Sequence, residues 1–244
     1  MYIETMTVDE KVKELQKASD KIYDVALRIV DRILNKLKKG ETKDLGTRKL
    51  TIDGTEYYYI LSAEKAKNKI NGCRHYSTQL IPYTIQTHSK NGLKYVVNFD
   101  FTHDNCVINE YEYHVFVRYR ERFLNNDHSL SLDNYCIESF FKRNNYGLKS
   151  MTEEGFISII SDGILLGTTK DPRLYNYKTF IVEEQLREDQ VLWSKYSEPW
   201  QRATQLLNEL YKDPYLITRE SFLKKEAALG KQLTENYLQK RENK

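Results

Sequence analysis

Three of the Asx-Gly dipeptides in the first two thirds of this 244-residue chain each separate a pair of apolar runs. They are Asp53-Gly54, Asn91-Gly92 and Asp162-Gly163. An Asx-Gly pair readily adopts the positive φ angles that a two-residue hairpin turn requires. The dipeptides therefore predict three antiparallel hairpins, over 49–61, 79–101 and 156–168.

Long helices are expected on both sides of these hairpins. Apolar residues recur at helical spacing over 8–39, and the basic run before Gly40 is typical of a helix C-terminus. The pattern is helical again over 184–212 and 218–241, with Asp213-Pro214 between them because proline cannot continue a helix. The short connection predicts that these last two helices form an antiparallel pair.

Shorter elements complete the pattern. We expect helices over 63–70, 109–124 and 133–144, and a last strand over 177–182. The segment 109–124 is open to two interpretations. Its tyrosines and valines alternate, which suits a strand, whereas its basic residues form one stripe at helical spacing. Its length and its charged end favour the helix.

The chain as a whole is expected to be an α+β protein. Its antiparallel sheet is built from hairpins, with a long N-terminal helix and a C-terminal antiparallel helix pair. Only four prolines and 10 glycines interrupt the sequence, which indicates long elements rather than many short turns. We expect an α+β core domain over 1–182 and a helical arm over 183–244 that packs on this core.

Composition favours a cytoplasmic protein without a cofactor or metal. Met1–Glu10 contains acidic residues and lacks the apolar core of a signal peptide, and no window reaches the apolar length of a membrane span. The three cysteines, Cys73, Cys106 and Cys136, are odd in number and far apart. This spacing argues against a disulfide framework and against a cysteine-rich zinc site.

Residues 65–99 contain no acidic side chain but several basic ones, with tyrosines between them. The residues concerned are Lys65, Lys67, Lys69, Arg74, Lys90 and Lys94, with Tyr76, Tyr83 and Tyr95. Basic residues with interleaved aromatics can bind a phosphate backbone and stack on bases. A solvated sheet face with ordinary lysines is the alternative, and it is the favoured interpretation.

His114, Arg118 and Arg122 are spaced four apart, so on a helix they share one face. A histidine can move protons near neutral pH, and an arginine can hold a phosphate with two parallel hydrogen bonds. Metal-independent phosphodiester cleavage needs such an acid/base group and such a cation. The alternative is a helix face tied by ion pairs, for example between Arg118 and Glu121.

The string from His114 to Phe123 resembles the His-x-x-x-Arg-x-x-x-Arg helix that opens certain small toxin-like domains of unknown function. Those domains are grouped with RelE-type and barnase/colicin-type ribonucleases. The resemblance implies a metal-independent ribonuclease or RNA-binding domain, with His114 as general acid/base and Arg118 and Arg122 on phosphate. Placement on the last predicted strand makes Tyr177 and Lys178 candidate partners.

Two further groups have chemical potential. Asp100, His103, Asp104 and Cys106 are metal-ligand types without a recognised spacing, and turn residues that bond to the backbone explain them better. Trp193 and Trp200 fall on one stripe of the C-terminal helical region, which favours packing or a partner helix.

Two functions therefore compete. The first is a non-catalytic interaction protein that uses its C-terminal helices to bind another protein or a second copy of itself. The second is the metal-independent ribonuclease or RNA-binding domain, with RNA as partner. The first ranks slightly ahead on physical grounds.

Overall fold

The computed structural model describes residues 2, 4–70, 73–102, 105–124, 127–144, 147–151, 155–182 and 185. The predicted C-terminal helices over 184–212 and 218–241, including both tryptophans, lie outside these residues except at Gln185. No helix within the described ranges is long and apolar enough to cross a membrane.

The described residues form nine strands, three α-helices and one short π-helical segment, η1. The strands are β1 (Thr42–Ile52), β2 (Thr55–Ile70), β3 (Cys73–Thr87), β4 (Lys94–Thr102), β5 (Asn105–Glu112), β6 (Gly147–Met151), β7 (Phe156–Ile160), β8 (Gly163–Asp171) and β9 (Leu174–Ile181). The helical elements are α1 (Val8–Leu34), α2 (Tyr113–Arg122), η1 (Leu132–Cys136) and α3 (Ile137–Arg143).

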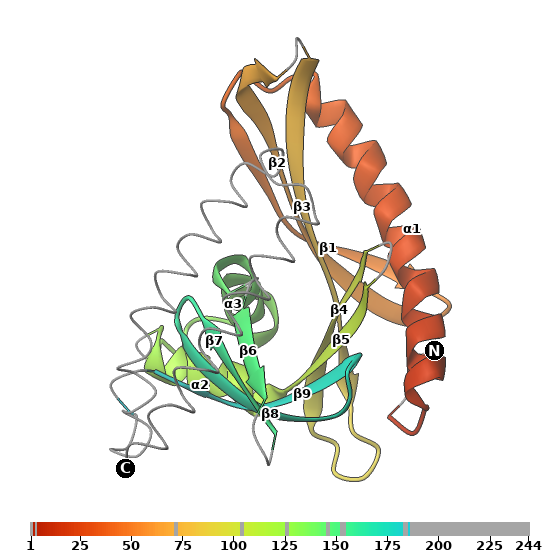
Figure 1. Cartoon of the computed structure of the whole chain (residues 1–244), viewed down its shortest axis with the longest axis vertical. Coiled ribbons are helices and arrows are strands. Elements are labelled where there is room, and N and C mark those ends of the chain that lie inside the picture. The colour runs from red at the N-terminus through yellow and green to blue at the C-terminus, as the bar shows by residue number, and fades with distance from the viewer. Residues whose placement is uncertain are drawn as a thin grey trace, which may run out of the picture. The chain divides into compact units, whose positions relative to one another are not determined.

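All nine strands belong to one mixed sheet, in the order β1-β2-β3-β4-β5-β9-β8-β7-β6 (Figure 1). Neighbouring strands are antiparallel except β5 and β9, which run parallel with Tyr111 opposite Tyr177. The prediction of an antiparallel sheet built only from hairpins is therefore wrong. Hairpin signals report pairing between consecutive strands, whereas β9 returns to β5 after a long crossover that includes α2 and α3.

The Asp53-Gly54 turn joins β1 to β2, and both of its residues have positive φ angles, of 49° and 80°. Asn91-Gly92 and Asp162-Gly163 also lie between paired strands, β3–β4 and β7–β8. The helix predicted over 63–70 is wrong, because β2 continues to Ile70 and pairs with β3. Pairing across the sheet overrides the local helical pattern there.

Helix α1 covers one face of the sheet (Figure 1). It begins at a capping box formed by Thr7 and Glu10, and its buried stripe packs on alternate residues of β2 such as Tyr57 and Tyr59. The helix ends at Leu34 rather than at residue 39. The Lys65 ammonium donates to the carbonyls of Leu34, at 3.3 Å, and Leu37, at 2.8 Å, and so satisfies this end of the helix.

The opposite face carries α2 and α3 over an aromatic core. Tyr58 and Ile60 of β2 belong to this core, because successive strand residues point to opposite faces. Within it, the Phe140 ring meets the Phe116 and Tyr119 rings edge-on, with centroids 5.2 Å apart in each pair. Such contacts add to the free energy gained by burial.

Asp162, in the β7–β8 turn, ties both short helices to the sheet. Its buried carboxylate accepts hydrogen bonds from Arg143 Nε at 2.8 Å, Tyr119 Oη at 2.8 Å and Asn144 Nδ2 at 3.0 Å. Asn144 Oδ1 in turn accepts from the Asp162 backbone N–H at 3.0 Å. Asp162 of the Asp162-Gly163 turn thus also connects the end of α3 with the middle of α2.

Candidate functional site

The ambiguous segment 109–124 is strand in its first part and helix in its second. Strand β5 ends at Glu112, and α2 occupies Tyr113–Arg122. The helical interpretation is therefore confirmed for the residues that carry His114, Arg118 and Arg122.

These three side chains lie on α2 as the spacing predicts, but they bond to the protein itself. Arg118 Nε donates to His114 Nε2 at 3.2 Å, and Arg118 Nη1 pairs with Glu121 Oε2 at 2.8 Å. Arg122 Nη1 donates to the Phe180 carbonyl at 2.6 Å, and burial, followed by the nearby Arg118 charge, lowers its pKa. His114 is exposed, but both guanidinium groups already serve protein acceptors.

The candidate partners on β9 are engaged as well. Tyr177 is buried, its ring stacks on Tyr111 with centroids 4.4 Å apart, and burial raises the pKa of its phenol. Lys178 pairs with Glu112 at 2.8 Å. Neither side chain is thereby placed to act on a phosphate beside His114.

The proposed metal constellation is only partly described. Asp100 and Cys106 lie on the adjacent strands β4 and β5, whereas His103 and Asp104 lie outside the described residues. Among the side chains that the structure describes, no group of three or more His, Cys, Asp and Glu is arranged to hold a metal.

The acid-free stretch 65–99 contributes less free charge than its sequence indicates. Lys65 is buried against the end of α1, and Lys94 pairs with Asp133 at 2.8 Å. The side chains of 66–77 lie outside the described part of the chain. Lys65 and Lys94 therefore have structural partners, in line with the favoured sheet-face interpretation.

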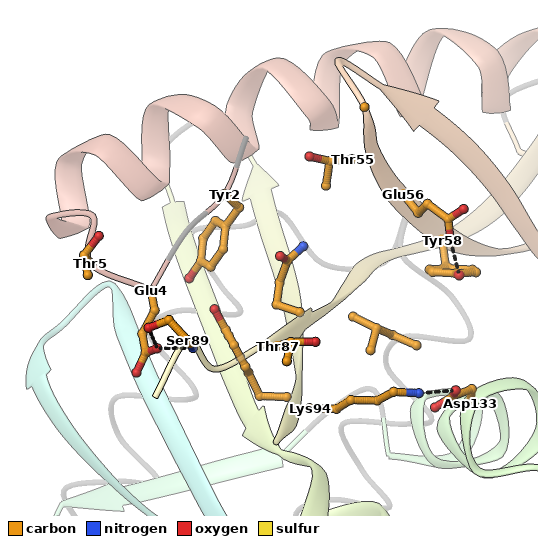
Figure 2. A pocket seen from close by; sticks show the side chains of 14 residues that line it. Tyr2, Glu4, Thr5, Thr55, Glu56, Tyr58, Thr87, Ser89, Lys94 and Asp133 are labelled. Carbon is orange, nitrogen blue, oxygen red and sulfur yellow. Dashed lines mark hydrogen bonds and ion pairs between the residues drawn. The ribbon is translucent and has the colours of Figure 1, made fainter. Parts of the chain in front are cut away.

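A pocket of about 590 Å³ opens elsewhere, beside the N-terminal segment (Figure 2). Its lining comes from the residues before α1, the β1–β2 turn, the β3 and β4 ends that face each other, and η1. The lining residues that carry the argument are Tyr2, Glu4, Thr55, Glu56, Tyr58, Tyr95, Lys94 and Asp133. The volume is in the range of sites for small organic ligands.

Three tyrosines, Tyr2, Tyr58 and Tyr95, line this pocket, and Tyr2 and Tyr95 are almost wholly buried. Burial is the main cause that raises the pKa of each phenol, so all three are neutral at physiological pH. The face of a neutral phenol ring carries negative potential and attracts cations.

Three carboxylates also line the pocket, and each is held ionised by donors. Hydrogen bonds from His88 and Ser89 lower the pKa of Glu4, and hydrogen bonds from Lys49 and Tyr58 lower that of Glu56. Burial opposes ionisation of Asp133, but hydrogen bonds from Lys94 and Tyr113 hold its pKa below the usual value.

Lys94 is the single cationic residue among those that form the described lining. Three carboxylates against one ammonium leave a formal charge of −2 on the lining. Lys49, which pairs with Glu56 from outside the lining, offsets part of this charge. The pocket is therefore an anionic, aromatic environment.

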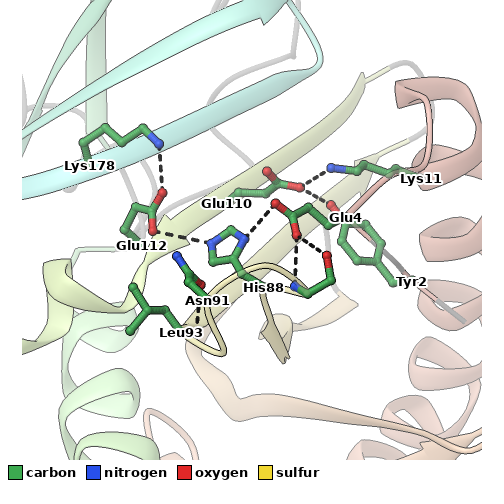
Figure 3. A network of polar contacts seen from close by, with 10 residues as sticks. Tyr2, Glu4, Lys11, His88, Asn91, Leu93, Glu110, Glu112 and Lys178 are labelled. Carbon is green, nitrogen blue, oxygen red and sulfur yellow. Dashed lines mark hydrogen bonds and ion pairs between the residues drawn. The ribbon is translucent and has the colours of Figure 1, made fainter.

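A polar network fixes the N-terminal wall of the pocket (Figure 3). His88, which follows β3, lies between two carboxylates, with Nδ1 3.1 Å from Glu4 Oε1 and Nε2 3.5 Å from Glu112 Oε2. Nearby, Tyr2 donates to Glu110, which also pairs with Lys11 at 2.6 Å. The segment before α1 is thereby anchored to β5 and to the β3–β4 turn.

Thr55 has an unsatisfied hydroxyl at the pocket. The residue is only 7% exposed, and its buried Oγ1 has no hydrogen-bond partner. Native proteins rarely leave such a group unpaired, because its desolvation costs free energy.

Sequence reasoning missed this pocket altogether. Glu4 and Ser89, which hydrogen-bond in its wall, are 85 positions apart. No motif joins residues at such separations, and the abundance of tyrosine, with 19 copies, was the one signal in the sequence.

Comparisons with protein-family models, with curated proteins and with solved structures found no match to this chain.

Proposed function

We propose that this chain is a non-catalytic binding protein whose pocket takes a small organic cation, such as a quaternary ammonium compound. The observation that carries the proposal is the combination of three tyrosines and three carboxylates around a cavity of about 590 Å³. Aromatic faces and carboxylates together are the surroundings in which proteins bind organic cations.

The charge of the lining decides between ligand classes. An anionic ligand would meet three carboxylates and one lysine, whereas a cation gains from both the carboxylates and the rings. A cation–π contact contributes about 0.5–2 kcal/mol, depending on how far the cation is desolvated.

Binding rather than catalysis follows from how the acid/base groups are used. Glu4 and His88 hold each other and Ser89, and Glu112 engages both His88 and Lys178. These groups position the N-terminal wall of the pocket. The expected interaction through the C-terminal helices concerns residues outside the described ranges and stays a prediction.

Isothermal titration with choline and with its neutral isostere 3,3-dimethylbutan-1-ol tests the proposal. We expect choline to bind at least roughly tenfold more tightly, because the two differ in charge and scarcely in shape, and its affinity to fall with added salt. Equal affinity for both compounds would contradict the proposal. So would the absence of choline binding at 10 mM, about twenty times a moderate Kd of 0.5 mM.

Asp133→Asn is the variant that locates the cation. We expect it to weaken choline binding about three- to tenfold, since it removes one partly screened charge from the lining. Glu121→Gln, which changes a carboxylate on α2 outside the lining, is the matched control and should leave the affinity unchanged. A larger loss in Glu121→Gln than in Asp133→Asn would place the ligand elsewhere.

A ribonuclease or RNA-binding function is the second candidate, and the shared face of α2 is the observation that favours it. Because Arg118 and Arg122 already bond to Glu121 and to the Phe180 carbonyl, we expect the chain to leave RNA intact in EDTA. Electrophoresis of a labelled RNA measures this. Hydrolysis that disappears in His114→Ala, but persists in an Arg28→Ala control on α1, would establish the ribonuclease instead.

A further inference from the structure

The segment that leads from α1 into β1 carries a concentration of positive charge. Residues 32–43 contain five basic residues and one acidic residue, Glu41, for a formal charge of +4. The basic residues, here called the basic end, are Arg32, Lys36, Lys38, Lys39 and Lys43. All five are exposed, and they extend from the last turn of α1 to the beginning of β1.

The side chains of the basic end are not tied to the protein. No hydrogen bond or ion pair joins any of them to another residue within the described ranges. The Glu41 carboxylate accepts from the backbone N–H of Lys38, at 2.6 Å, rather than from a basic side chain. Near the short helices, by contrast, Lys94 pairs with Asp133 at 2.8 Å. The charge of the basic end is therefore left for solvent ions or for a partner.

Stabilisation of α1 accounts for only part of this charge. Cations favour the C-terminus of a helix, but the effect falls off within the last turn, where Arg32 lies. Lys65 of β2 already donates to the carbonyls of Leu34 and Leu37 at this end. The lysines after residue 37 lie beyond the last turn, so the helix gains little from them.

The basic end lies beside the far end of the β2–β3 hairpin (Figure 1). The Gly40 N–H donates to the Lys65 carbonyl at 2.6 Å, and the Lys65 N–H donates to the Glu41 carbonyl at 3.0 Å. Beyond these bonds β2 and β3 continue as a two-stranded ribbon, in which Lys69 lies opposite Arg74. The fold thus places a second stretch of basic sequence, which contains no acidic residue, next to the first.

The composition of this surface favours a polyanion over a protein or a membrane. Interface cores between proteins are poor in charge and rich in aromatic residues, and helices that lie on membranes bury apolar side chains. None of the large apolar side chains that are exposed in the described part of the chain falls within 32–43. A nucleic acid needs no such side chains, because lysine and arginine neutralise its phosphates and release condensed counterions.

We propose that the basic end binds the phosphate backbone of duplex DNA without reading its sequence. A duplex carries one negative charge per about 1.7 Å of its axis, so several phosphates lie within reach of five neighbouring cations. The adjoining ribbon supports a duplex, since the major groove of B-DNA admits two antiparallel strands. None of the five residues lines the pocket or lies on α2, so this surface is separate from both functions considered above.

Fluorescence anisotropy of a labelled DNA duplex, titrated with the full chain, tests the proposal. In about 50 mM KCl we expect a Kd of about 1 µM, and a plot of log affinity against log salt concentration should have a slope of about −4. Duplexes of unrelated sequence should bind within about twofold of one another, because phosphate contacts carry no sequence information. Vesicles that contain phosphatidylserine, measured by sedimentation, should bind at least roughly tenfold more weakly.

Three charges are removed from the basic end in the variant Lys38→Gln/Lys39→Gln/Lys43→Gln. We expect it to weaken DNA binding at least roughly tenfold and to make the salt slope shallower by about 3, one for each lost phosphate contact. A matched control removes three other exposed lysines that have no partner among the described residues, in the variant Lys13→Gln/Lys17→Gln/Lys90→Gln.

The control variant should change the salt slope by less than about 1, because its lysines lie outside the basic end. Absence of DNA binding at about 50 µM protein, well above the expected Kd, would overturn the proposal. An equal loss of affinity in the two triple variants would also overturn it, as would tighter binding of the vesicles than of the DNA.

Discussion

Lys11→Met is expected to lower the free energy of unfolding by about 3 kcal/mol, because it leaves a buried carboxylate without its cation. The Lys11 and Glu110 side chains are only 6% and 13% exposed, and their charged atoms are 2.6 Å apart. Tyr2 then remains as the donor to Glu110. Urea denaturation followed by circular dichroism measures the loss.

The double variant Lys11→Met/Glu110→Gln separates the charge from the packing. With both charges gone, we expect more than half of the lost free energy to return, since a neutral pair needs no buried counter-ion. Lys21→Met is the control on the same helix, where the pair with Asp53 is exposed and 3.7 Å long. It should change stability by less than about 0.5 kcal/mol. Equal losses in Lys11→Met and Lys21→Met would refute the assigned role of the buried pair.

Asp162→Asn is expected to cost about 2–3 kcal/mol, because the amide cannot accept all the hydrogen bonds that the carboxylate receives. Arg143 meets this carboxylate through both Nε and Nη2, while Tyr119 and Asn144 donate to Oδ2. The substitution turns an acceptor oxygen into a donor among these groups. Thermal and urea unfolding measure the effect.

Asp53→Asn provides a control of the same chemistry in another Asx-Gly turn. Asp53 is exposed, and asparagine tolerates its φ of 49°. We therefore expect its stability to change by less than about 0.5 kcal/mol. If both variants lose the same amount, the effect belongs to the turn type rather than to the buried network around Asp162.

The turns were predictable from sequence because their signal is local. Asp53-Gly54 supplies its own positive φ angles, and the capping box of Thr7 and Glu10 likewise needs only residues within one helical turn. Residues 63–70 show the limit of local signals. Their sequence pattern is helical, but they form part of strand β2 because they pair with β3. The parallel pairing of β5 with β9 had no local signal at all.

The site residues divide in the same way. Spacing placed Arg118 on the face of His114, and the structure has the two side chains bonded at 3.2 Å. The spacing could not show that the carbonyl of Phe180, on a distant strand, would accept a hydrogen bond from Arg122. The pocket depends wholly on contacts between separate elements, such as Glu4 with Ser89. Its chemistry became visible only after the sheet order was known.

The parallel pairing of β5 with β9, here called the β5–β9 seam, also has a consequence during synthesis. Asn109 and Tyr177, which meet across it, are 68 positions apart, so β5 leaves the ribosome long before its neighbour exists. Until then the nascent chain carries a bare strand edge that can pair with another molecule. Closing so large a loop is entropically costly and slow. Completion of this seam is therefore the stage at which the growing protein depends most on protection from aggregation.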